Sequence, residues 1–446
     1  MCTPVIVSAA FNCLMSEVLS SLSPLLLHLF LLLVLHNPIF THTYIQHSTM
    51  KALVHSALQS TTHLPILAAR VKVPVKPIEM SSVLQRSRRI IATDSIDSKP
   101  LLYKSANELH EDLVHRSAWA VGFLSAINFE KSSHKSRAQM SPPQSGTLDY
   151  FSVDPSLRDS LCTLLDIFMH WFISACELPL VVDDATHKEF LVKLAELQKP
   201  AGQELLSEII RIGRASSASP QLHFVLETIC RLRVYWQLLT ANHRAGVHRT
   251  GAGVFRDDIR LSSIAKNVLE GVVAQTTTTY SCCPDINISG DEDSTACLTH
   301  AEPNLSYIFA ELMKNASRAT VEEHHRKGLP NATLPPVEVN IRSLEDGNVV
   351  EAEFSDCGAG IHKNEIDRVW QFGYTTNAKK HHKAATKADT PIVAGFGLGL
   401  PMSRMYAEQF GGSLTFGRTD RGCSVVFRHS REGAEGLCPV YPPTFD

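Results

Sequence analysis

The sequence predicts a two-domain α+β fold, with helices alone in the N-terminal part and helices mixed with strands in the C-terminal part. The chain has 446 residues, a length that suits two domains. Apolar residues recur at helical spacing between about 157 and 243. Alternation of apolar and polar residues, which is typical of strands, becomes clear only in the last quarter of the chain.

The composition is that of an ordinary soluble globular protein, with 44% hydrophobic and 20% charged residues. The net charge of −3 argues against a nucleic-acid binder, because no basic excess is available for phosphates. The eleven cysteines form no CxxC pair and no repeated spacing. A zinc cage or a disulfide framework is therefore not expected, and a reducing compartment is favoured.

Residues 1–90 are predicted to be a leader. The apolar run 25–35 is too short to span a bilayer, and no Lys or Arg precedes Lys51. From Met50 to Arg89, basic residues alternate with Ser, Thr and Ala, and Glu79 is the only acid, which is typical of a mitochondrial transit sequence. We expect translation to begin at Met50, or cleavage to remove about 90 residues, and no transmembrane anchor in the mature protein.

The N-terminal domain is predicted over 91–255. Helical patterns cover 157–178, 185–198, 201–213 and 220–243, and the ambiguous stretch 91–125 allows a helix near 106–126. The polar residues 129–147, with two prolines, indicate a linker or surface loop. Short breaks between the helices favour an antiparallel, four-helix-bundle-like arrangement that serves core packing.

The C-terminal domain is predicted over 256–431, followed by a tail over 432–446. Residues 256–273 are expected to form a helix and 276–299 a polar connection with room for one strand. Strands are predicted over 337–341 and 349–354, joined by turn residues at 345–348. A second hairpin is predicted from 413–416 and 423–427, around 420–422.

The helix predicted over 307–322 carries the first chemical signal. Relative to Glu311, polar side chains follow at offsets of 3, 4, 7 and 11, so they share one face: Lys314, Asn315, Arg318 and Glu322. An amide oxygen can ligate Mg²⁺, the cations can meet phosphate oxygens, and the acid can take a proton. The alternative is a solvated charged face, which is the usual meaning of such a pattern.

Two glycine motifs follow. Asp356, Gly358 and Gly360 come directly after a predicted strand, where a carboxylate can accept the exocyclic amino group of adenine; the alternative is a tight strand-to-helix turn. Residues 395–400 open a helix that is predicted to end near 410, and alternate glycines there expose backbone N–H groups to an anion. The motif is not a Rossmann fingerprint, because the required strand and spacing are missing. Residues 373–394 are predicted to form a mobile lid.

The order of these motifs resembles the N, G1 and G2 boxes of the GHKL superfamily, which implies a GHKL (Bergerat) α/β sandwich for the C-terminal domain. Residues 311–322, 372–376 and 395–407 are similar to those of mitochondrial pyruvate and branched-chain α-ketoacid dehydrogenase kinases. The resemblance is strong over 300–430, weaker over 175–275 and faint before residue 150. No phosphoacceptor-histidine helix of the bacterial type precedes it.

The resemblance implies an ATP-dependent kinase of the mitochondrial matrix that phosphorylates a serine of the E1 subunit and inactivates the complex. The lipoyl domain of the E2 core would be a partner, and a homodimer is open. Glu311 would be the general base and Asn315 the Mg²⁺ ligand, and Lys314 and Arg318 would support the phosphates or the positioning of the base. The implied nucleotide contacts also include Asp356, Gly358, Gly360, Thr375, Thr376, Gly395, Gly397, Gly399, Leu400 and Cys423.

The chain departs from the family pattern at several positions. Cys423 stands where a Thr usually lies near adenine, so that hydrogen bond is lost or rebuilt through water. Gln371 replaces an Asp that lies beside K⁺ in the branched-chain enzyme, although the Val369 and Tyr374 carbonyls can still bind K⁺.

Tyr307 matches the branched-chain type, and residues 440–446 lack the Asp-Trp motif of the pyruvate kinases. Both features lean toward a branched-chain substrate. A different class of function, an ATP-binding regulatory or scaffold protein without kinase activity, is the alternative, because the N-terminal resemblance is faint.

Overall fold

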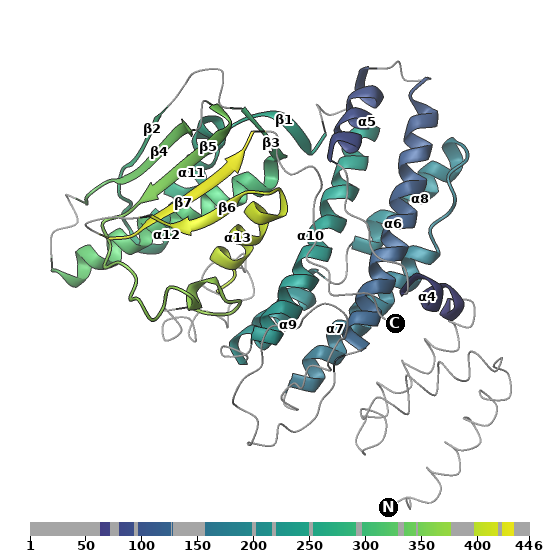
Figure 1. Ribbon diagram of the computed structural model, residues 1–446, viewed down its shortest axis with the longest axis horizontal. Coiled ribbons are helices and arrows are strands. Elements are labelled where there is room, and N and C mark those ends of the chain that lie inside the picture. The colour runs from purple at the N-terminus through teal and green to yellow at the C-terminus, as the bar shows by residue number, and fades with distance from the viewer. Residues whose placement is uncertain are drawn as a thin grey trace, which may run out of the picture.

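The computed structural model describes residues 63–71, 80–92, 97–125, 127, 157–198, 202–215, 220–248, 253–290, 297–328, 334–344, 347–375, 397–417 and 422–431. A domain of long helices lies beside a domain in which helices pack against a sheet (Figure 1). This confirms the predicted two-domain α+β architecture. Within the described ranges, no helix combines the length and apolar character needed to cross a bilayer.

The regular elements described in the N-terminal domain before Phe255 are all helices, as predicted. Its helices are α4 (Leu64–Val71), α5 (Met80–Ala92), α6 (Lys99–Ser125), α7 (Arg158–Cys176), α8 (Asp184–Gln198), α9 (Gly202–Ala215) and α10 (Pro220–His248). The four helices predicted over 157–243 match α7 to α10, and α6 begins several residues before the predicted position. The predicted loop 129–147 lies outside the described residues.

The core of the helical domain is aromatic and aliphatic. The ring of Trp171 on α7 packs 4.8 Å from that of Trp236 on α10, measured between centroids. A charged side chain of α6 is buried in this core: Arg116 is 2% exposed, and its Nε donates to Asp112 Oδ2 at 2.6 Å. Its guanidinium also lies 5.0 Å from the centroid of the Tyr235 ring. These contacts compensate the cost of removing the charge from water.

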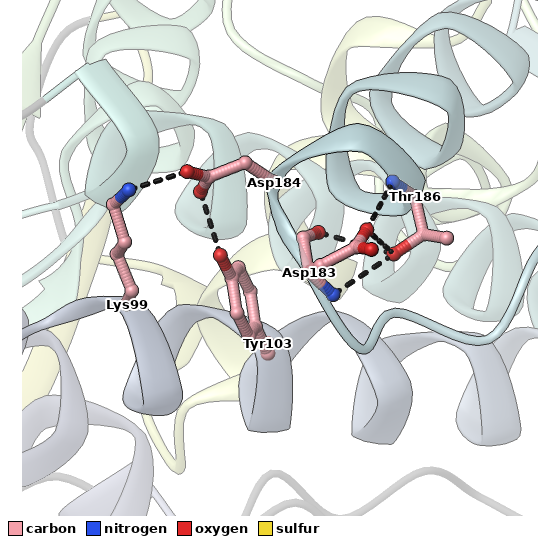
Figure 2. A network of polar contacts seen from close by, with 5 residues as sticks. All are labelled: Lys99, Tyr103, Asp183, Asp184 and Thr186. Atoms are coloured by element: carbon pink, nitrogen blue, oxygen red, sulfur yellow. Dashed lines mark hydrogen bonds and ion pairs between the residues drawn. The ribbon is translucent and has the colours of Figure 1, made fainter.

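Local hydrogen bonds determine where α8 begins (Figure 2). The Thr186 N–H donates to Asp183 Oδ1 at 2.8 Å, and the Asp183 N–H donates to Thr186 Oγ1 at 3.0 Å, which is the reciprocal pattern of a capping box. The next residue, Asp184, accepts hydrogen bonds from Lys99 and from the Tyr103 hydroxyl. The start of α8 is thereby attached to α6.

Two helices fall within the residues predicted as leader. Leu67 of α4 and Ile90 of α5 are both buried, and Arg86 of α5 forms an ion pair with Glu108 of α6. These two helices therefore pack on the helical domain. The interpretation of 1–90 as a leader stays a prediction.

The C-terminal domain contains β1 (Phe255–Arg260), α11 (Leu261–Tyr280), β2 (Ile286–Gly290), β3 (Cys297–Ala301), α12 (Glu302–Arg326), β4 (Val337–Leu344), β5 (Val349–Ser355), the 3₁₀-helix η4 (Arg368–Trp370), α13 (Gly399–Gln409), β6 (Ser413–Phe416) and β7 (Ser424–Ser430). The two predicted hairpins are confirmed as β4–β5 and β6–β7. The predicted polar connection over 276–299 instead contains the end of α11, the whole of β2 and the start of β3.

The prediction of a helix over 256–273 is wrong at its start. Residues up to Arg260 form β1, which pairs antiparallel with β3, and the helix begins only at Leu261. Phe255 and Ile259 are the buried positions of β1, and their spacing of four resembles a helical stripe. A register shift between Arg256 and Ile259 produces this spacing within a strand, and sequence periodicity cannot reveal such an irregularity.

The main sheet has the strand order β2-β4-β5-β7-β6, in which β2 and β4 are parallel and the other pairs are antiparallel. Its apolar face packs against α11 and α12, where Phe309 lies 5.0 Å from Phe354 between ring centroids. The opposite face is polar: the Glu351 carboxylate is covered by ion pairs with Arg342 and Arg428. The sheet is therefore covered by helices on one side (Figure 1).

Helix α13 lies between the two domains (Figure 1). Met405 and the neighbouring Leu398 and Phe410 belong to the hydrophobic core of the helical domain. Ala407 of the same helix belongs to the core that covers the sheet. The two hydrophobic cores therefore share this helix as a common wall.

Candidate nucleotide and catalytic site

Helix α12 presents the predicted acid to the interior of the C-terminal domain. Glu311 is 7% exposed, and its Oε1 forms an ion pair with Lys314 Nζ, one turn further along the helix. A Cβ atom on Gly399 would lie 2.4 Å from Glu311 Oε2. The backbone at the start of α13 can therefore approach the carboxylate closely because residue 399 has no side chain.

The other predicted residues of α12 lie beside this pair. Asn315 and Arg318 are half-buried on the same helix. Tyr307 lies one turn before Glu311, and its ring contacts that of Tyr406 of α13 edge-on at 5.1 Å. Burial, followed by the charge of Glu311, raises the pKa of Tyr307 well above its ordinary value. The Tyr307 hydroxyl is therefore neutral at physiological pH.

Asp356 occupies the predicted position immediately after β5. Its Oδ1 accepts hydrogen bonds from the N–H of Gly358 at 2.8 Å and of Cys423 at 3.0 Å. Burial raises the pKa of Asp356, and these two N–H donors act in the opposite direction. Because both donors contact Oδ1, Oδ2 is the oxygen that can accept the amino group of a base.

The glycines around Asp356 allow close backbone packing. A Cβ atom on Gly358 would lie 2.7 Å from the Ala319 Cβ of α12, and one on Gly360 would lie 3.0 Å from the Gly422 carbonyl oxygen. Gly422, which the sequence prediction missed, has a φ of +68° and would place its Cβ 2.0 Å from the Asp356 carbonyl oxygen. The requirement for glycine at 358 and 360, two of the implied nucleotide contacts, thus has a steric basis.

Thr320 is a second residue that the sequence prediction missed. Its Oγ1 accepts a hydrogen bond of 3.2 Å from the Cys357 N–H, which attaches the Asp356 loop to α12. A threonine within a helix gives no sequence signal for this role. Its hydroxyl commonly bonds to the preceding turn of its own helix instead.

The segment that follows η4 connects the predicted nucleotide residue Thr375 to the glycine motif before α13. The Gly373 N–H donates to the Gly397 carbonyl oxygen at 2.9 Å, which brings the loop before Thr375 onto the glycine motif. The Tyr374 hydroxyl donates to Glu365 Oε1 at 3.0 Å, and Arg368 lies over its ring. Leu400 follows Gly399 in the first turn of α13. Thr376 and Gly395, and most of the predicted lid, lie outside the described residues.

The predicted residues thus form two clusters in one domain. In the first cluster, the Glu311 carboxylate contacts Lys314 and Gly399. In the second, the Asp356 carboxylate accepts hydrogen bonds from Gly358 and Cys423. Cys423 contacts the carboxylate through its backbone, so this contact does not require the Thr of the family pattern. Burial, followed by the negative charge of Asp356, raises the pKa of the Cys423 thiol to about 12, so the thiol stays protonated.

Comparison with known proteins agrees with this geometry. Residues 300–433 match the family described as histidine kinase-, DNA gyrase B-, and HSP90-like ATPase. Residues 300–433 therefore form a domain of the GHKL type. The match covers both clusters and the strands that support them, so the predicted superfamily is confirmed.

Within the GHKL superfamily, the chain is similar to mitochondrial pyruvate dehydrogenase (acetyl-transferring) kinases. It is 33% identical to the kinase of Schizosaccharomyces pombe over 32% of this chain and 33% of that relative. It is 38% identical to the kinase of Drosophila melanogaster, again over 32% of this chain and 33% of that relative. Identity to the Arabidopsis thaliana kinase is 25% over 58% of this chain and 72% of the relative. The chain therefore spans about a third of the first two relatives.

Proposed function

We propose that this protein is an ATP-dependent serine kinase that phosphorylates the E1 subunit of a mitochondrial α-ketoacid dehydrogenase complex and thereby inactivates it. The observation that supports it most is the buried Glu311 carboxylate, which lies against the first residue of α13 in a GHKL ATPase domain. A carboxylate there is near the helix N-terminus at which phosphates bind. The names of the relatives supply the substrate class.

In this mechanism Glu311 accepts the proton of the serine hydroxyl, and Mg·ATP supplies the transferred phosphoryl group. Lys314 now pairs with Glu311 and is close enough to exchange that partner for a phosphate oxygen. Asp356 accepts the adenine amino group through Oδ2. Two further side chains of α12 complete the proposal: Asn315 would ligate the metal, and Arg318 would contact the phosphates.

We propose that the site holds two cations, Mg²⁺ and K⁺. The side-chain oxygen of Asn315 is a hard donor of the kind that Mg²⁺ takes. For K⁺, the Val369 and Tyr374 carbonyls lie on the segment that also holds Gln371. Gln371 Oε1 is buried and has no hydrogen-bond partner within the described part of the chain. An unpaired buried acceptor is costly, so we infer that Gln371 contributes an oxygen to K⁺ at this position.

The proposed setting follows from the relatives, which are named as mitochondrial. We place the protein in the mitochondrial matrix, with the lipoyl domain of the E2 core as the docking partner of the helical domain. A homodimer and a branched-chain or pyruvate E1 substrate are both compatible with this proposal. Nucleic acid is not a proposed partner, given the net charge of −3.

Transfer of radiolabelled phosphate from ATP to purified E1 tests the activity, with pyruvate and branched-chain E1 assayed side by side and the E2 core present. Glu311→Gln should abolish transfer and retain nucleotide binding, because it removes the proton acceptor and keeps the shape. Asn315→Ala should lose Mg·ATP affinity in calorimetry. Persistent transfer by Glu311→Gln would refute the assignment of the base.

One observation favours the alternative of an ATP-binding regulatory protein without kinase activity: Lys314 already neutralises Glu311. In that case, folded protein would bind Mg·ATP but transfer no phosphate to either E1. Such a result, with the E2 core present, would reject the kinase and retain the nucleotide site.

A further inference from the structure

The end of α9 contacts the loop that precedes the nucleotide residues. A Cβ atom on Gly213 of α9 would lie 2.4 Å from the Phe372 carbonyl oxygen. Reciprocally, a Cβ on Gly373, whose φ is +79°, would lie 2.6 Å from the backbone nitrogen of Arg214. Two backbones thus pack directly on each other, and neither residue can carry a side chain without displacing the other segment.

The contact continues from this loop to the catalytic carboxylate. Gly373 donates its N–H to the Gly397 carbonyl oxygen, and a Cβ on Gly397 would lie 2.4 Å from the Tyr374 carbonyl oxygen. Two residues later, Gly399 lies against Glu311 Oε2. Each contact in this series involves backbone at a glycine. A displacement at α9 therefore cannot be absorbed by a change of side-chain rotamer before Gly397.

A second contact holds the other end of α13. Arg231 of α10 has a side chain that is only 4% exposed, and its Nη2 lies 2.9 Å from Glu408 Oε2 in the last turn of α13. Phe372 and Leu398 are also buried in the core of the helical domain. The helical domain thus contacts both the loop before the nucleotide residues and the two ends of α13.

We propose that Gly213 is a positioning residue of the nucleotide site, through which the helical domain sets the affinity for Mg·ATP and Mg·ADP. The proposal rests on the proposed function only in that this site binds nucleotide. Because coupling between sites is reciprocal, nucleotide binding should in turn favour one position of α9. Simple domain packing, the alternative, predicts that substitutions here change stability and leave nucleotide affinity unchanged.

The test compares Gly213→Ala with Gly271→Ala in the full chain. Gly271 lies within α11, and a Cβ there would meet no heavy atom within 4 Å. Both substitutions replace a helical glycine and should gain helix propensity. Mg·ADP affinity is measured by calorimetry, and thermal unfolding without nucleotide is measured for each variant.

Coupling between sites typically changes an affinity by about 5- to 150-fold, so we expect Gly213→Ala to bind Mg·ADP at least about tenfold more weakly. Gly271→Ala should bind as the wild type does. Equal affinities for all three proteins would overturn the proposal, as would an equal loss in both variants.

A second pair of variants keeps the proposal testable if Gly213→Ala does not fold. Glu408→Gln removes the charge that pairs with Arg231 and, within α13, with Arg404, and Glu189→Gln removes a charge from an ion pair with Lys193 that lies wholly within α8. Only Glu408→Gln should weaken Mg·ADP binding, by about threefold or more. Unchanged affinity in Glu408→Gln would count against the coupling.

Nucleotide binding also separates this proposal from the kinase assignment. A wild-type chain that binds Mg·ADP but does not phosphorylate E1 would reject the kinase, and the Gly213 comparison would still decide the coupling. A folded wild-type chain that binds no Mg·ADP would overturn both.

Discussion

Asp356→Asn is the sharpest test of how the site recognises its base. In the structure, Oδ1 accepts the N–H groups of Gly358 and Cys423 at 2.8 and 3.0 Å. The amide oxygen of Asn can keep both bonds, so its NH₂ group takes the place of Oδ2. A donor then faces the amino group of adenine, and a charge-assisted hydrogen bond of about 1.5–3 kcal/mol is lost.

That energy corresponds to a loss of ATP affinity of about 10- to 150-fold. Inosine triphosphate carries an acceptor where ATP carries the amino group, so its affinity relative to ATP should rise in the variant. Calorimetry with both nucleotides measures the ratio. Glu353→Gln is the matched control, because Glu353 lies on β5 and accepts a hydrogen bond of 2.6 Å from Ser424. An unchanged ratio in Asp356→Asn would refute the role of Oδ2.

Further predictions concern charge, pH and the adenine pocket. Lys314→Met removes the cation beside Glu311 and should weaken Mg·ADP binding at least about tenfold by calorimetry, since a charged phosphate contact is lost; undiminished affinity would contradict its phosphate role. Burial lowers the pKa of His243 to about 3 from 6.5, so the unfolded chain takes up this proton first as the pH falls. Stability should therefore fall below pH 6.5 by up to about 1.4 kcal/mol per pH unit, and His243→Gln should reduce that slope in urea unfolding; an identical slope would exclude His243 as a cause. Cys423→Thr keeps the backbone bond to Asp356 and adds a hydroxyl, which should strengthen ATP binding by about 1 kcal/mol; weaker binding would show that the thiol already fits the pocket.

Much of the fold could be predicted from periodicity. The long amphipathic helix α7 and the alternating strands β4 and β5 each have one dominant apolar face, which the sequence displays directly. β1 could not be predicted, because its register irregularity gives the strand a helical spacing of buried residues.

The residues of the candidate site likewise divide into those that the sequence could predict and those that it could not. Glu311 and Asp356 could be predicted because their motifs are local in the sequence. Thr320 and Gly422 could not, because their roles depend on which backbone lies opposite them. Gly213 is the extreme case: its partner, the Phe372 carbonyl, lies in the other domain, and a single helical glycine carries no sequence signal for it.

The shared position of α13 has a practical consequence for anyone who isolates the ATPase domain. A fragment that begins near residue 255 would leave Phe372, Leu398, Met405 and Phe410 without the helices that cover them. The newly exposed apolar surface would favour self-association, and the detached α13 would lose its Arg231 contact. Poor solubility or weak nucleotide binding of such a fragment would therefore reflect where the chain was cut, and would say little about the intact protein.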